Sequence, residues 1–384
     1  MSRFTIQTFV NHMNISLQIK AMSNCLFLFL LLSSTLNAQN FGEKGHPMNK
    51  STDSREILKY WGTTPYGEIN LYESAYKILS AEKNASYADL IKNSSFKDLL
   101  IQQNREILAG PMLGQIKSNG ASVWLRTLEP AKVEGKIYGP VFTDEKTELS
   151  AVVKIDDLKP STSYPYKIIV NGITLSPSVE QIIKTLPEDN QYEEVKIAFG
   201  SCPHRWGLGN HTLLEQIQER GNQAMLFLGD IAVQDRNDHL GMHRADYLLR
   251  DFLPAWQNFA AQTPVYASWD DHDYFDNDKA GIPEGYSEKG RNGVREVFKH
   301  SWVNHSYGDE ANQEGIFTRD RIGPFDILMT DNRYFRTGEK GSFLGPQQMN
   351  WLKNNYWIVK GHLLSCPVDL CGVILCPMVK IHGE

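Results

Sequence analysis

The sequence predicts an α/β protein in which a small β-sandwich precedes a domain of alternating strands and helices. Residues 110–187 contain short alternating apolar runs separated by turn residues, whereas short apolar strands alternate with helix-length segments from residue 195 onward. Strand–helix–strand alternation indicates a sheet that is at least partly parallel and covered by helices. A chain of 384 residues is long enough for two such domains.

The N-terminal residues have the order of a secretory signal peptide. An apolar run at residues 25–32 follows Lys20 and precedes a small-residue segment that ends at Ala38. We therefore predict that residues 1–38 are a signal peptide, with Met13 or Met22 as alternative starts, and that the protein is exported to the periplasm, the medium or the cell surface. The run is shorter than the ~20 apolar residues of a membrane span, so no stable span is expected. A retained N-terminal anchor is the alternative interpretation.

Residues 39–109 are polar, and we interpret them as a lead-in with helical stretches at 87–91 and 96–108 that packs against the part of the chain that follows it. In the sandwich region, Asn171-Gly172 separates two apolar runs and predicts a two-residue hairpin turn. The segment at residues 158–164 resembles a fibronectin-type turn that ends in a corner tyrosine, Tyr164. An ordinary Pro-Ser-Thr turn is the alternative interpretation.

The second domain, residues 194–356, contains the chemistry. Its predicted strands are residues 195–199, 224–228, 265–269 and 325–330. Its helix-length segments are 212–220 and a longer amphipathic stretch at 246–261 with an internal Pro254. The strands run into polar residues at their carboxyl ends, namely Cys202, Asp230, the run Asp270-Asp271-His272-Asp273, and Asp331. Because ligands of open α/β sheets bind beyond the carboxyl ends of the strands, we expect these four ends to converge on one site.

Carboxylates, an imidazole and a thiol in one crevice favour a metal centre. Such groups repel or neutralise one another unless cations compensate them. A metal would activate water, and a pair of metals would hold both ends of an in-line displacement, which suits phosphate-ester hydrolysis. The run at residues 270–273 is the more specific signal, because the Gly229-Asp230 pair is also an ordinary strand-to-turn signal.

Other interpretations of these residues can be weighed by spacing. An EF-hand loop from Asp271 would need Asp or Asn and then Gly where Phe275 and Asp276 stand. A cysteine phosphatase would need an arginine six residues after Cys202, and that residue is Leu208. A hydrolase that pairs Cys202 with His211 is disfavoured, because nearby carboxylates would raise the pKa of the thiol. A buried, inert Cys202 is the remaining alternative.

The motifs together resemble those of PhoD-like phosphatases, the alkaline phosphatase D family. The resemblance covers residues 110–355. It is carried by Phe199-Gly200-Ser201-Cys202, Leu228-Gly229-Asp230, Trp269-Asp270-Asp271-His272-Asp273 with Asn277-Asp278, Thr330-Asp331-Asn332-Arg333-Tyr334-Phe335-Arg336, and Leu344-Gly345-Pro346-Gln347-Gln348 with Trp351-Leu352.

This resemblance implies a fibronectin-like β-sandwich, a calcineurin-like metallophosphoesterase domain, and hydrolysis of phosphomonoesters or phosphodiesters. It implies iron and calcium, or another divalent pair, as cofactors. The metal ligands would be Cys202, Asp230, Asp271 and Asn277. His272 would be the catalytic acid or electrostatic stabiliser, acting beside Asp271. A phosphate-ester substrate is expected; the net charge of −6, without a basic stripe, predicts no specific nucleic-acid binding.

Two departures from the family pattern are visible. Val233 stands where the family commonly has an iron-binding tyrosine, and nothing matches the later Gly-Asp-x-His motif. Residues 357–384 are instead apolar and rich in cysteine, so we interpret them as an aberrant tail after an incomplete domain, with an unpaired sheet edge. His362 and His382 could in principle replace the missing ligands. A catalytically impaired pseudoenzyme or secreted binding protein is therefore the alternative function.

Overall fold

The computed structural model describes residues 54–134, 140–176, 179–188, 194–304, 306–308, 314–323, 325–337, 341–358, 364–365 and 373–377. The predicted signal peptide lies outside these residues, as do His362 and His382. The described residues, which begin at Ser54, belong to one compact unit. No helix in these ranges is both long and apolar enough to cross a membrane.

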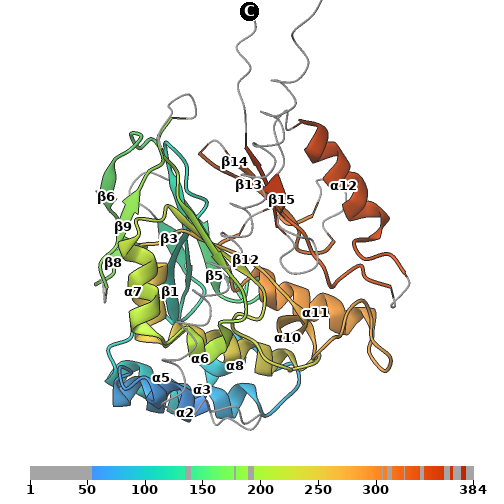
Figure 1. The fold of residues 1–384 in the computed structure, drawn as a ribbon. Helices are drawn as coiled ribbons and strands as arrows, with labels where there is room; N and C mark the ends of the chain where they lie inside the picture. The colour runs from blue at the N-terminus through green and yellow to red at the C-terminus, as the bar shows by residue number, and fades with distance from the viewer. Residues whose placement is uncertain are drawn as a thin grey trace, which may run out of the picture. The chain divides into compact units, whose positions relative to one another are not determined.

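The described chain is a mixed α/β protein that begins with four helices (Figure 1). They are α2 (Ser54–Tyr60), α3 (Tyr66–Leu79), α4 (Tyr87–Lys92) and α5 (Ser94–Gln102). The predicted packing of this lead-in is confirmed, because α3 lies against α8 (Leu240–Asp251). Buried tyrosine hydroxyls fix the contact: Tyr72 donates to the Ala245 carbonyl at 3.2 Å and Tyr87 to the Arg244 carbonyl at 2.9 Å.

Three small antiparallel sheets come next in the chain. The first has the order β1 (Ala109–Gly114), β2 (Ala121–Arg126) and β5 (Ser150–Ile155). The second has the order β4 (Val141–Phe142), β3 (Lys132–Glu134), β7 (Ile169–Val170) and β8 (Ile173–Thr174), and the third pairs β6 (Ser163–Pro165) with β9 (Ile182–Lys184).

Two local predictions for this region are confirmed. Asn171 and Gly172 form the hairpin turn between β7 and β8, and both have positive φ values of 50° and 81°, as a type I′ turn requires. The Tyr164 hydroxyl accepts a hydrogen bond from the Lys159 amide five residues upstream at 3.0 Å, as in a tyrosine corner. The fibronectin-like and calcineurin-like assignments stay predictions.

A parallel sheet forms the centre of the second half. Its order is β10 (Ile197–Gly200), β11 (Ala224–Leu228) and β12 (Val265–Ser268). The associated helices are α6 (His204–Gly207), α7 (His211–Glu219), α8, α9 (Pro254–Ala260), α10 (Asp271–Tyr274) and α11 (Glu288–Lys299). The single segment expected at 246–261 is two helices, because Pro254 lacks an amide hydrogen and begins α9 instead of continuing α8.

The fourth predicted strand, β14 (Phe325–Met329), does not join this parallel sheet. It lies in an antiparallel sheet of order β13 (Thr318–Ile322), β14, β16 (Val373–Pro377) and β15 (Leu364–Ser365). Only two residues connect β13 to β14, which is too short for the crossover that parallel pairing needs.

Strand β14 has a partner on each side, β13 and β16. Part of the segment interpreted as an aberrant tail supplies β16. The unpaired edge was not assigned to a particular strand and stays a prediction. Helix α12 (Gly345–Ile358) also continues two residues beyond the predicted end of the domain at residue 356.

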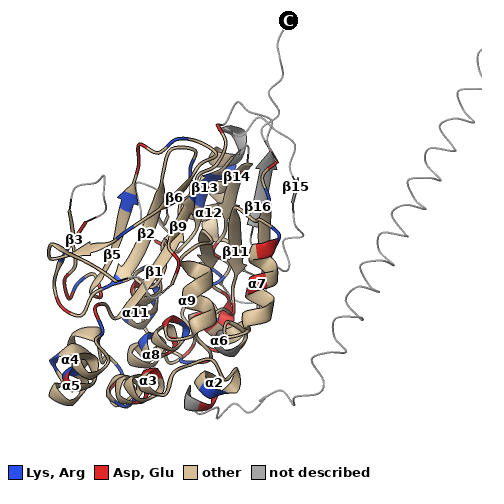
Figure 2. Ribbon diagram, turned by 90° about the vertical axis from the view of Figure 1, so that its left-hand side faces the viewer, with Lys and Arg blue, Asp and Glu red and all other residues tan. Residues whose placement is uncertain are grey.

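An aromatic core supports the carboxyl ends of the parallel strands. The Phe227 ring on β11 lies 5.6 Å from Trp256 and 6.4 Å from Trp302, between centroids. Such large, fully buried rings hold the carboxyl end of β11 in place, so the loop that carries Asp230 starts from a rigid position. Figure 2 shows that Lys and Arg are interspersed with Asp and Glu over the described elements.

Candidate metal centre

The loops after β11 and β12 can pack closely because the residue at their contact is a glycine. Gly229 has φ +103°, and a Cβ atom on it would lie 2.4 Å from the Asp270 Cβ. Only glycine permits this close approach. The next residue, Asp230, also has a left-handed backbone, with φ 53°, which directs it toward Asp271 and His272 at the start of α10. The Gly-Asp and Asp-Asp-His motifs are thus adjacent in space.

Three side chains form a group that could hold a cation. One carboxylate oxygen each of Asp230 and Asp271 and a ring nitrogen of His272 lie within 4.8 Å of one another. Both acids are buried, and Asp230 Oδ1 has no hydrogen-bond partner among the described residues. Burial and the charge of Asp270 raise the pKa of Asp230 to about 6. A buried, unpaired carboxylate beside another acid is costly without a compensating charge, so these residues fit a metal ion with oxygen and nitrogen ligands.

His272 is held by an acid that the sequence analysis did not identify. Its Nδ1 lies 2.6 Å from Asp235 Oδ1, and the Asp235 amide donates to the His272 carbonyl at 3.2 Å. Burial alone would lower the pKa of His272, but the Asp235 hydrogen bond and the charges of Asp230 and Asp271 outweigh it and raise the pKa. Because Asp235 takes Nδ1, Nε2 is the ring nitrogen left to face either a metal ion or a substrate.

His204 is a second residue that the sequence analysis missed. Its ring lies 5.7 Å from the His272 ring in an edge-to-face arrangement, and its amide donates to the Asp230 carbonyl at 2.9 Å. The sequence feature that could have identified His204 is its position two residues after Cys202.

Cys202 lies beside the group of three. Its Sγ donates to Asp230 Oδ2 at 3.4 Å, and its amide donates to the Gly229 carbonyl at 3.0 Å. The residue is exposed, so the buried, inert alternative is wrong. Desolvation of the sulfur and the Asp230 charge raise the pKa of the thiol to about 11. A protonated thiol is a poor nucleophile, which argues against the cysteine hydrolase unless a metal lowers that pKa.

Asn277, the remaining predicted ligand, is exposed and its amide donates to Asp278 Oδ2 at 2.7 Å. The same loop does orient a member of the group, since the Asp278 amide donates to Asp271 Oδ2 at 2.6 Å. The ligand role of Asn277 stays a prediction.

Asp331 follows β14 but does not join the group that could hold a cation. Its fully buried carboxylate accepts hydrogen bonds from the Trp269 indole at 2.8 Å and from three backbone amides at 2.9–3.0 Å. The expectation that all four strand ends supply the site was therefore wrong for Asp331, because its oxygens are already satisfied by the local fold. Its loop nevertheless reaches the site through Arg333, whose Nε donates to Asp270 Oδ1 at 2.6 Å.

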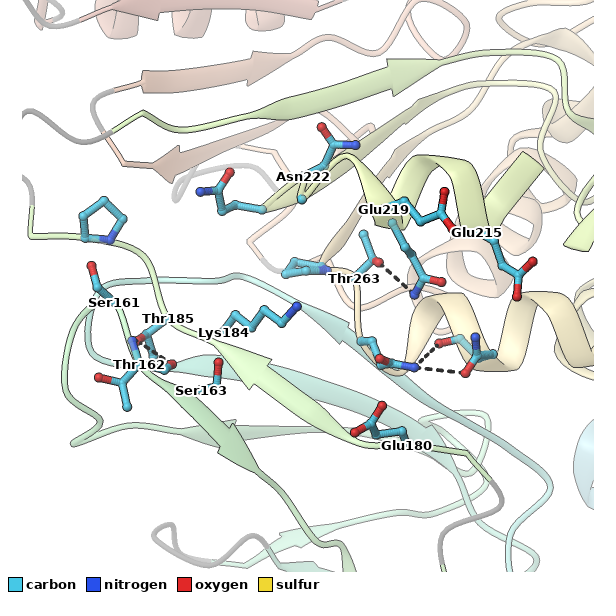
Figure 3. A pocket seen from close by; sticks show the side chains of 17 residues that line it. Ser161, Thr162, Ser163, Glu180, Lys184, Thr185, Glu215, Glu219, Asn222 and Thr263 are labelled. Atoms are coloured by element: carbon cyan, nitrogen blue, oxygen red, sulfur yellow. Dashed lines mark hydrogen bonds between the residues drawn. The ribbon is translucent and has the colours of Figure 1, made fainter. Parts of the chain in front are cut away.

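A groove of about 560 Å³ lies elsewhere, at the amino ends of the parallel strands. Side chains from β9, α7 and α9 face one another across it, and Gln218 there donates to Thr263 at 3.4 Å (Figure 3). Gln223 and Pro264, which line it, directly precede β11 and β12, whereas Asp230 and Asp271 follow those strands. The groove is therefore separate from the candidate metal centre.

Comparisons with known proteins bear on the fold. Residues 104–187 match the family model of a domain of unknown function (DUF7800). No curated protein matches the sequence. The chain is similar to a solved structure of PhoD, with a TM-score of 0.53 and 19% sequence identity, over 65% of this chain and 59% of that chain. At this identity the likeness shows the fold alone, and the match spans about three fifths of the length of the PhoD chain.

Proposed function

We propose that this chain is an exported, metal-dependent phosphoesterase that hydrolyses phosphomonoesters or phosphodiesters. The observation that carries the proposal is the group of Asp230, Asp271 and His272 beyond the carboxyl ends of β11 and β12, with a buried carboxylate oxygen that lacks a partner among the described residues. The PhoD-like fold and the motifs that resemble PhoD-like phosphatases support it. Open α/β sheets place their ligands at this end of the strands.

Asp230 and Asp271 would hold the metal, with Cys202 and Asn277 as further ligands. Cys202 is suitably placed because its sulfur lies 3.4 Å from Asp230 Oδ2. A metal held there would supply Lewis acidity toward the phosphoryl oxygens and would favour ionisation of water near neutral pH. Iron and calcium, or another divalent pair, are the proposed ions. An iron site here would lack a phenolate ligand at residue 233, since that residue is a fully buried valine.

His272 would act on the leaving group instead of binding the metal, because Nε2 cannot both coordinate an ion and donate a proton. Asp235 holds Nδ1 and orients the ring, which leaves Nε2 to donate a proton to the departing ester oxygen. The raised pKa of His272 keeps more of the imidazole protonated near neutral pH, as this role requires. Arg333 holds Asp270, and its guanidinium also lies 3.5 Å from Asp271 Oδ1, so it offsets part of the negative charge at the site.

The experiment is hydrolysis of p-nitrophenyl phosphate and bis-p-nitrophenyl phosphate by the purified chain without its signal peptide. Metal-free protein should be inactive, and added divalent ions should restore turnover that a chelator abolishes. A thiol alkylator and the variant His211→Ala test the alternative of a hydrolase that pairs Cys202 with His211. The His211 side chain is exposed and paired with Glu215. Turnover that resists chelation and is lost with His211→Ala would contradict the proposal.

A secreted binding protein is the second candidate, and the buried Val233 favours it. That alternative predicts bound metal or phosphate ester without turnover. Stoichiometric metal together with no hydrolysis of either ester would support it over the enzyme.

A further inference from the structure

The last acid of the run at residues 270–273, Asp273, is not a member of the group that could hold a cation. Asp273 is fully buried in α10, and its two oxygens accept hydrogen bonds from four backbone amides. The Ile231 amide donates to Oδ1 at 3.1 Å and to Oδ2 at 3.2 Å, and the Ala232 and Val233 amides donate to Oδ1 at 3.3 Å. The fourth donor is the Asp270 amide, which reaches Oδ2 at 3.3 Å.

These bonds connect the two loops that carry the candidate ligands. Ile231 is the neighbour of Asp230 after β11, and Asp270 is the neighbour of Asp271 after β12. One carboxylate therefore fixes the backbone on both sides of the site, between residues that are about 40 positions apart in the chain.

Helix capping alone does not account for this arrangement. Asp273 and Asp270 do form a capping box at the start of α10, which needs the bond to the Asp270 amide. Capping does not need the three amides of residues 231–233, which belong to the other loop. Because buried carboxylates with several amide donors are held in one geometry, Asp273 is suited to keep the two loops together.

We propose that Asp273 is a positioning residue, which sets the separation of the Asp230 and Asp271 carboxylates before a cation binds. This proposal rests on the proposed metal centre. It goes further because it assigns the arrangement of the ligands before metal binding to Asp273, which is not itself a ligand. Residues that orient metal ligands typically change metal affinity by roughly 10- to 100-fold when they are replaced.

The first test is the affinity for Mn²⁺, measured by isothermal titration calorimetry on the wild-type chain and on Asp273→Asn. The asparagine keeps the size of the side chain, but its amide nitrogen cannot accept a hydrogen bond. We expect a loss of roughly 10- to 100-fold. Asp326→Asn is the matched control: this buried carboxylate on β14 is paired with Arg319 and Arg321, and its replacement should leave Mn²⁺ affinity close to that of the wild type.

Equal affinities in Asp273→Asn and Asp326→Asn would overturn the proposal. Asp273→Glu separates position from charge, since it keeps the charge but moves the oxygens. Wild-type affinity in Asp273→Glu together with a loss in Asp273→Asn would show that charge, rather than position, matters. A wild-type chain that binds no Mn²⁺ at all would instead contradict the proposed metal centre.

A second measurement needs no variant that might fail to fold. Hydrogen exchange of the metal-free wild type should show that the amides of Ile231, Ala232 and Val233 are protected, because their bonds to Asp273 exist before metal binds. Exchange of these amides at the rate of exposed amides, while the core strands stay protected, would show that Asp273 does not hold the loop.

Discussion

The imidazole of His272 and the carboxylate of Asp235 lie 2.6 Å apart, between Nδ1 and Oδ1, although the two residues are 37 positions apart in the chain. This bond gives the candidate acid a fixed orientation, and it has a direct consequence for activity.

Replacement of Asp235 by Asn should lower kcat by roughly 10- to 100-fold, because the ring loses the partner that fixes its orientation and favours its charged form. Metal content should stay stoichiometric. Steady-state hydrolysis of p-nitrophenyl phosphate measures the effect. Asp238→Asn is the control, since Asp238 is on the same loop but pairs with Lys83; equal losses in the two variants would count against the role of Asp235.

Gly229→Ala should destabilise the protein and weaken metal binding, because a Cβ at this position would meet the Asp270 backbone and side chain at 2.4–3.1 Å. Gly221→Ala is the matched control. Gly221 also has a positive φ, of 68°, but a Cβ there would meet nothing within 4 Å, so only the conformational cost of about 1 kcal/mol is expected. Urea unfolding should show a larger loss for Gly229→Ala, and equal losses would mean that the loops do not pack as described.

Arg333→Gln should lower the stability of the metal-free protein by about 2 kcal/mol, because Asp270 and Asp271 lose a cationic partner. Bound metal compensates the same acids, so it should stabilise the variant more than it stabilises the wild type. Thermal melts with and without Mn²⁺ test this. An identical Mn²⁺-induced shift of Tm in both proteins would show that Arg333 does not offset this charge.

His243 should make the protein less stable in mild acid. The residue is buried, its Nε2 lies 2.7 Å from the Asn237 carbonyl oxygen, and burial lowers its pKa from 6.5 to about 4. Between these values the unfolded chain binds a proton that the folded chain does not, so stability rises with pH across this window. The contribution lost as pH falls from 6.5 to 4 is on the order of 3 kcal/mol.

Urea unfolding at pH 7.5 and pH 5 measures this effect. His243→Gln should be less stable than the wild type at pH 7.5 but should show a flatter pH dependence. The same pH dependence in both proteins would place the acid sensitivity elsewhere.

The sequence contained enough local information to predict the strands and the ligand motifs. Apolar runs that end in Gly229-Asp230 and in Asp270–Asp273 identify β11 and β12 and their loops, because burial and turn chemistry act over a few residues. The bonds Asp235–His272 and Arg333–Asp270 span 37 and 63 residues, and no periodic pattern encodes them.

The pairing of β14 could not be predicted from local sequence either. Apolar composition predicted the strand itself, but its pairing depends on the short connection to β13 and on β16, which is formed by distant residues. Asp331 resembled a ligand because it follows a strand, and only tertiary packing shows that the Trp269 indole and three backbone amides satisfy it. Pro254, in contrast, was a visible signal that the segment 246–261 would divide into two helices.

Elemental analysis of the purified wild type and of Asp230→Asn is the decisive test of the proposed metal centre. We expect stoichiometric metal in the wild type and none in the variant, because Asp230 supplies the buried carboxylate at the centre of the site. A wild-type chain without metal, or a variant that retains it in full, would contradict the proposed metal centre.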